Sequence, residues 1–125
     1  MSLDVYLFGP VYVVVCRCQE CGNKHTTEDR ENLYSDNITH NLTAMADAAG
    51  LYKPVWHPET LGIRIANQLI PILRDGLETL RSNPGKFAAF NPANGWGSYP
   101  CLLQFVKDYL DACEMHPDAT IEVSR

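Results

Sequence analysis

The chain lacks a long apolar segment, an excess of basic residues and a familiar catalytic signature. Its apolar run over residues 11–15 is far too short to span a bilayer, and the first four residues lack the basic region of a signal peptide. The net charge of −5 has the wrong sign for general binding to a phosphate backbone. No Walker loop, GxGxxG, HExxH, GxSxG or paired-carboxylate pattern occurs. We therefore expect a cytoplasmic protein that binds neither membranes nor nucleic acid.

The size and composition are those of an ordinary globular domain. The chain has 125 residues, of which 46% are hydrophobic and 20% charged. A chain of this length buries about two-thirds of its unfolded surface, which is enough for a core without disulfides. We expect one domain over residues 1–125, with a cysteine-rich loop at about residues 16–25.

Alternating and β-branched segments predict strands at both ends of the chain. Leu3, Val5 and Leu7 form one apolar face, and residues 11–15 continue as β-branched and aromatic. The polar residues 25–34 are predicted to return as an exposed strand, which places the cysteine-rich loop at the tip of a hairpin. The alternation over residues 120–125 predicts a terminal strand that pairs with the first.

Helical periodicity dominates the middle of the chain. A helix is predicted to open at residues 37–43 with Thr39 as its N-cap, and residues 51–59 are predicted to form a loop. Two longer helices are predicted over residues 61–82 and from residue 98 or 99 to about 116. The fold class is therefore α+β, a small antiparallel sheet (N-terminal hairpin plus C-terminal strand) packed against about three helices.

The cysteine-rich loop is the densest group of metal-capable side chains. Cys18-Gln-Glu-Cys21-Gly22 has the form of a zinc knuckle, because two intervening residues let both thiolates face one ion. Cys16 and His25 are the nearest residues that could complete a structural zinc site. The same pattern is compatible with unliganded thiols, and less well with a redox dithiol, since no strand-to-helix context surrounds it.

Two further clusters are candidate ligand sites. Asn37, His40 and Asn41 gather near a predicted helix start, where a neutral imidazole and two amides could hold an anion or a metal. The alternative is that these residues only cap the helix and brace the loop.

The second cluster is the glycine-containing loop over residues 91–99. Its Asn94, Trp96 and Tyr99 could contact a ligand, and the two aromatic residues could stack on a ring. Alternatively, Trp96 fills the core and the glycines serve turns. Trp56 and His57 have the same ambiguity, and Trp56 is expected to anchor its loop.

Several motifs resemble one group of proteins. They are Asn-Ile-Thr-His-Asn-Leu at 37–42, Trp-His-Pro-Glu at 56–59 and Phe-Asn-Pro-Ala-Asn-Gly-Trp-Gly-Ser-Tyr at 90–99. With these, nearly the whole chain resembles an uncharacterised family of small proteins from bacteriophages, prophages and bacteria. The resemblance implies no biochemical activity. It implies that a shared function lies around His40 and Trp96 and that the cysteine-rich loop is an accessory.

Our leading hypothesis is a small phage-type accessory protein that acts by binding. It would hold a protein partner or a small ligand near His40, Trp56 and Trp96, with the cysteine-rich loop clamped by structural zinc. The alternative is a metal-dependent hydrolase, in which Glu20 or Glu28 would be the available base. A redox dithiol and a nucleic-acid-binding knuckle are less favoured. No residue is assigned as catalytic.

Overall fold

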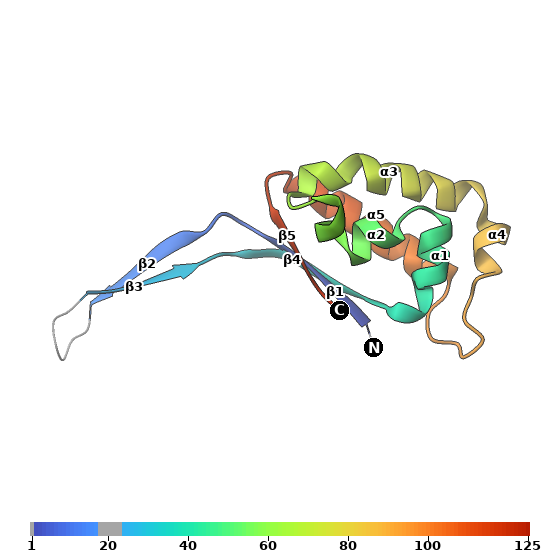
Figure 1. Ribbon diagram of the computed structural model, residues 1–125, viewed down its shortest axis with the longest axis horizontal. Helices are drawn as coiled ribbons and strands as arrows, with labels where there is room; N and C mark the ends of the chain where they lie inside the picture. Colours follow the sequence, from blue (N-terminus) through green and yellow to red (C-terminus); the bar gives the residue numbers. More distant parts are fainter. Residues whose placement is uncertain (1, 18–23) are drawn as a thin grey trace.

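A computed structural model describes residues 2–17 and 24–125. In it the chain has two parts (Figure 1). The body comprises residues 2–8 and 32–125, and the ribbon is a two-stranded extension formed by β2 (Tyr12–Arg17) and β3 (Lys24–Asp29). The α+β class predicted from the sequence is confirmed.

The sheet of the body has β1 (Ser2–Phe8) at its centre. It pairs antiparallel with β4 (Asn32–Thr39) on one side and with β5 (Thr120–Ser124) on the other. Leu3, Val5 and Leu7 are fully buried, so the predicted apolar face of this strand and its pairing with the terminal strand are both confirmed. The intervening residues of β1 lie on the opposite face, which the helices do not cover (Figure 1).

The ribbon continues from the β1–β4 pair. Gly9 N–H donates to the carbonyl oxygen of Glu31 over 2.8 Å where the two parts join, and Tyr12 then pairs with Asp29. β2 and β3 flank residues 18–23, which lie outside the described part of the chain. The predicted N-terminal hairpin is thus divided between two sheets.

The helices pack on one face of the body sheet (Figure 1). They are α1 (Thr43–Ala48), α2 (Tyr52–Trp56), α3 (Ala66–Ser82), α4 (Pro84–Ala88) and α5 (Tyr99–Met115), with 3₁₀ turns η1 (His40–Leu42) and η2 (Pro58–Leu61). None of the described helices is long and apolar enough to cross a membrane.

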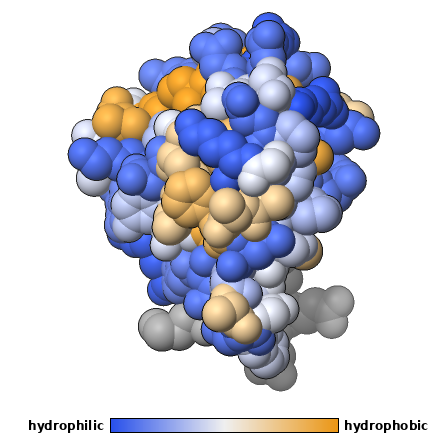
Figure 2. All heavy atoms as spheres, turned by 90° about the vertical axis from the view of Figure 1, so that its right-hand side faces the viewer, coloured by the Kyte–Doolittle hydropathy of each residue, from blue (hydrophilic) through white to orange (hydrophobic). Residues whose placement is uncertain are grey.

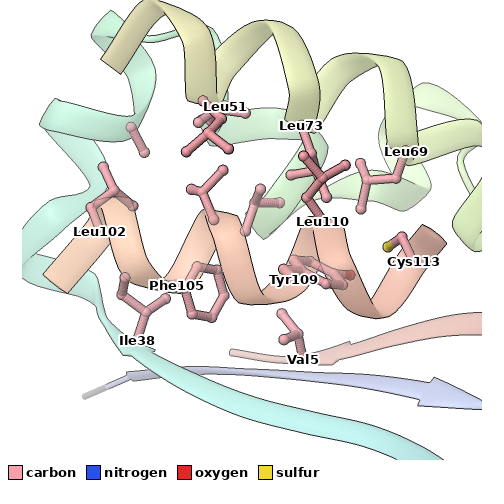
Figure 3. Close-up of a cluster of buried hydrophobic side chains, with 14 of the residues drawn as sticks. Val5, Ile38, Leu51, Leu69, Leu73, Leu102, Phe105, Tyr109, Leu110 and Cys113 are labelled. Carbon is pink, nitrogen blue, oxygen red and sulfur yellow. The ribbon is translucent and has the colours of Figure 1, made fainter. Parts of the chain in front are cut away.

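α5 lies between α3 and the sheet and contacts both (Figure 3). Leu69 and Leu73 of α3 approach α5 from one side, and Val5 and Ile38 approach it from the sheet. The predicted stripe on α3 and the predicted face of α5 are buried as expected; they comprise Leu69, Leu73, Leu77, Leu80, Leu102, Val106, Tyr109, Leu110 and Cys113. The core is therefore a three-layer arrangement centred on α5.

Three predicted segments differ from the structure. Residues 37–39 extend β4, because they pair with the first residues of β1, and the helical turn begins only after them, at η1. Thr39 is the N-cap of that turn, as predicted, and its Oγ1 accepts a 3.3 Å hydrogen bond from the N–H of Asn41. Residues 51–59 contain α2 and the start of η2, since burial of Val55 and Trp56 favours a folded turn over an open loop. The helix predicted from residue 61 begins at Ala66, because Gly62 adopts a left-handed conformation and Ile65 bridges to Thr120.

Candidate ligand-binding site

A surface pocket forms where the end of β4, η1 and the loop over residues 91–98 meet. Its volume is about 510 Å³, and its lining is neutral: Ser2, Asn37, Thr39, Asn41, Asn94 and Trp96. The pocket thus brings together four of the residues that the sequence marks as candidates for ligand binding, namely Asn37, Asn41, Asn94 and Trp96.

Asn37 is held by the outer face of the sheet. Sheet register places it opposite Asp4, and its Nδ2 donates to Asp4 Oδ1 over 2.6 Å and to Ser2 Oγ over 2.8 Å. These two bonds use both amide hydrogens. The Oδ1 of Asn37 is therefore fixed in orientation and remains available as an acceptor.

Asn94 is held through its amide oxygen, whereas Asn37 is held through its NH₂ group. Its Oδ1 accepts a 3.0 Å hydrogen bond from the backbone N–H of Trp96. This uses the amide oxygen and leaves the NH₂ group as a donor. The pocket consequently offers one oriented acceptor and one oriented donor from two separate elements.

The loop over residues 91–98 lies directly against β4 and η1. Gly97 has φ +99°, and a Cβ built there would lie 2.8 Å from Thr39 Cγ2, so this position requires glycine. Asn41 Nδ2 donates to the carbonyl oxygen of Trp96 over 3.5 Å. At the end of the loop, Asn91 Oδ1 accepts from the N–H of Tyr99 over 2.7 Å and satisfies the start of α5.

Trp96 stands at the surface with 70% of its area exposed. The interpretation that it fills the core is therefore wrong. Loop 91–98 and α4 lie at the end of the body remote from the ribbon, and that end is mostly hydrophilic with scattered apolar patches (Figure 2). An exposed indole beside three amides is the feature of this end that most suggests recognition of a ligand.

His40 and Trp56 belong to the core side of the same region and do not line the pocket. Trp56 is 1% exposed, which confirms that it anchors its segment, and its Nε1–H donates to His40 Nδ1 over 3.0 Å. Because an indole N–H only donates, Nδ1 of His40 carries no proton in this arrangement. The pair connects η1 to α2 and thereby fixes one wall of the pocket.

His57 and Tyr99 also have partners elsewhere. His57 Nε2 lies 3.0 Å from the hydroxyl of Tyr52, and Arg125 bonds Glu59 over 2.7 Å beside them. The pKa of Glu59 lies below its ordinary value, chiefly through a hydrogen bond from its own backbone and further through Arg125. Tyr99 donates its hydroxyl to the carbonyl oxygen of Leu80 over 2.6 Å and ties α5 to α3.

The candidate zinc ligands are placed only in part. Cys16 and His25 are Cα register partners across the ribbon, whereas Cys18 and Cys21 lie outside the described residues. Within residues 2–17 and 24–125, no group of three or more His, Cys, Asp or Glu residues is arranged to hold a metal ion.

Ser2 and Thr39 join the pocket although the sequence did not mark them as ligand-binding residues. They are register partners at the end of the β1–β4 pair. The alternation of β1 puts Ser2 on the same face as Asp4, but the partner strand is not encoded locally.

Comparison of the chain with protein-family models, with curated proteins and with solved structures gives no match. The function must therefore be inferred from the site itself.

Proposed function

We propose that this protein is a binding module that holds a neutral, hydroxyl-bearing ligand, such as a sugar residue, in the pocket beside Trp96. The observation that carries the proposal is the pairing of a 70% exposed indole with a lining that contains no charged side chain. A volume of about 510 Å³ falls within the range of about 300–1,000 Å³ that is typical of small-ligand pockets.

The hydrogen-bonding groups favour a ligand that can both donate and accept. Asn37 offers its Oδ1 and Asn94 offers its NH₂, each oriented by bonds within the protein. A hydroxyl group satisfies either partner, whereas an anion would meet the Asn37 acceptor unfavourably. The flat face of Trp96 supplies a large contact area at low conformational cost.

The test is a titration with neutral mono- and disaccharides, in which binding is measured by tryptophan fluorescence and by calorimetry. Trp96 is the exposed indole and Trp56 the buried one, so a change in emission on binding should come from Trp96. Trp96→Ala should weaken binding by at least about tenfold, and Trp96→Phe by less, because it retains an aromatic face.

Asn94→Asp is the sharper variant. It keeps the oxygen that accepts from the Trp96 N–H but replaces the donor NH₂ with a carboxylate oxygen. We expect binding to fall by about tenfold or more while the fold is unchanged. Asn67→Asp, an exposed change on α3 away from the pocket, is the matched control. Saturable binding that survives both Trp96→Ala and Asn94→Asp would contradict the proposal.

The zinc clip formed by Cys16, Cys18, Cys21 and His25 is a second, separate proposal. It is supported by the register that sets Cys16 opposite His25 and by the knuckle spacing in the sequence. About one zinc per chain by elemental analysis, lost in a Cys18→Ser/Cys21→Ser variant, is the expected result. Equal zinc in both proteins would overturn this assignment.

A further inference from the structure

The ribbon is the part of the molecule that the pocket does not use. It projects from the body, and β3 is the only described element with which β2 makes extensive contact (Figure 1). An isolated two-stranded ribbon is at best marginally stable in water, because its faces are open and each strand keeps an unpaired edge. The ribbon would therefore gain stability from a partner that pairs with one of its edges.

Exposed valines mark one face of the ribbon. Val13 and Val15 are each 60% exposed, and Val11 just before β2 is 61% exposed. Because side chains alternate along a strand, Val13 and Val15 project from the same face. A row of exposed β-branched residues on a projecting element is typical of an interaction surface.

The two free edges of the ribbon differ in character. β2 reads Tyr-Val-Val-Val-Cys before Arg17, without the Lys, Glu or Pro residues that discourage pairing at an edge strand. β3 begins with Lys24 and ends with Glu28 and Asp29. The edge that is open to pairing is therefore that of β2.

We propose that a second copy of this chain occupies this edge, with β2 pairing antiparallel to β2 in a continuous sheet of order β3-β2-β2-β3. About a two-fold axis at residue 14, Val13 of each copy lies opposite Val15 of the other. The apolar pattern is thus self-complementary, and cross-strand valine pairs stabilise such a junction.

The distribution of charge along the ribbon favours the same partner. By register, the basic residues Arg17 and Lys24 are opposite each other at the far end, whereas Glu28 and Asp29 lie near the body. Antiparallel pairing brings the far end of each ribbon beside the near end of the other. Arg17 of each copy then lies at the same end of the junction as Asp29 of the other, two strands or about 10 Å away, which favours association at low salt. The basic residue that follows Asp29, Arg30, is already paired with Glu122 over 2.7 Å.

The test is sedimentation velocity of the full chain over a dilution series, with a thiol reductant and a chelator present. We expect a monomer–dimer equilibrium that shifts to monomer on dilution and at high salt. Amide hydrogen exchange at β2 should slow as the concentration rises, because its edge N–H groups become paired.

Val13→Lys places a charge in the proposed junction at an exposed position, so the monomer should keep its circular dichroism spectrum. It should raise the dimer dissociation constant by at least about tenfold. Met115→Lys is the matched control, since Met115 is 74% exposed at the end of α5, away from the ribbon. This control should dimerise as the parent does.

Three results would overturn the proposal. One is a protein that stays monomeric up to its solubility limit. Another is a dimer that Val13→Lys leaves unchanged. The third is a dimer that forms only with added zinc or only without reductant, since that would assign the association to the cysteine-rich loop.

Discussion

Val5 in β1 and Val13 in β2 are both strand valines, yet the first is 0% exposed and the second 60% exposed. The difference lies in what covers each strand. α5 packs over the body sheet, whereas no described helix packs over the ribbon (Figures 1 and 3). The same residue type therefore contributes stability in the body and remains available for interaction in the ribbon.

The comparison extends to ionisable groups. The body encloses Cys113 and Tyr109, and burial raises the pKa of both groups, that of the Cys113 thiol to about 12. The hydroxyl of Tyr109 has no hydrogen-bond partner among the described residues. Burial within the body thus disfavours the charged forms of these two side chains.

The strongest test of this difference is to make the same substitution in the body and in the ribbon. Val5→Ala removes two buried methyl groups beneath α5 and should lower the free energy of unfolding by about 2–3 kcal/mol, through lost burial and a residual cavity. Val13→Ala should change it by no more than about 0.5 kcal/mol at concentrations where the protein is monomeric. Urea denaturation followed by far-ultraviolet circular dichroism measures both.

If Val13→Ala cost as much as Val5→Ala in the monomer, the ribbon would be packed against the body, and the distinction between the two regions would fail. The concentration dependence provides an internal control. Only the Val13 variant should change the dependence of stability on protein concentration.

The second prediction concerns alkaline pH. The unfolded state releases the Cys113 proton above about pH 9, whereas the folded state retains it up to about pH 12, so stability falls as the pH rises between these values. The slope should reach up to about 1.4 kcal/mol per pH unit for this group. Urea midpoints measured from pH 8 to 10.5 should therefore decline less steeply in Cys113→Ala than in the parent.

Cys101→Ala is the matched control, because Cys101 is an exposed thiol on the same helix. It should keep the slope of the parent. A parental slope that is unchanged in Cys113→Ala would mean that the thiol meets water in the folded state, and that the body is less closed than the core packing indicates.

Hydrophobic periodicity predicted the elements whose buried face can be recognised from their own residues. The alternation of Leu3, Val5 and Leu7 and the spacing of Leu69 and Leu73 identify a buried face without knowledge of the covering element. The boundaries were less predictable. The segment Asn37–Thr39 resembles the start of a helix, but pairing with β1 extends it, and such pairing depends on residues more than thirty positions away.

The candidate site was predictable in composition and not in arrangement. Trp96 and Asn94 stood out because an aromatic residue and amides cluster in a loop with glycines. Two long-range contacts determine which other residues line the pocket. Trp56 binds His40, and neither residue lines it, whereas the β1–β4 register brings Ser2 into the lining. No local pattern encodes either contact.

Loop 91–98 is exposed like the ribbon, yet its backbone is held against the body. Trp96 is more exposed than Val13 and Val15 of the ribbon, but a Cβ built at the adjacent Gly97 would meet the side chains of Thr39 and Leu42. Gly95 also has a positive φ, of 76°, yet a Cβ built there would meet open space. Alanine at either position incurs backbone strain of about 1 kcal/mol, and only Gly97→Ala adds a steric conflict with the body.

We therefore expect Gly97→Ala to cost about 1 kcal/mol more than Gly95→Ala in urea denaturation, since the side chains it meets must shift. The same change should weaken ligand binding more, because displacement of the loop moves Trp96 away from Asn37. Equal costs for the two variants would show that the loop is not fastened at Gly97. The loop would then resemble the ribbon, because contacts with the body would not position its exposed side chains.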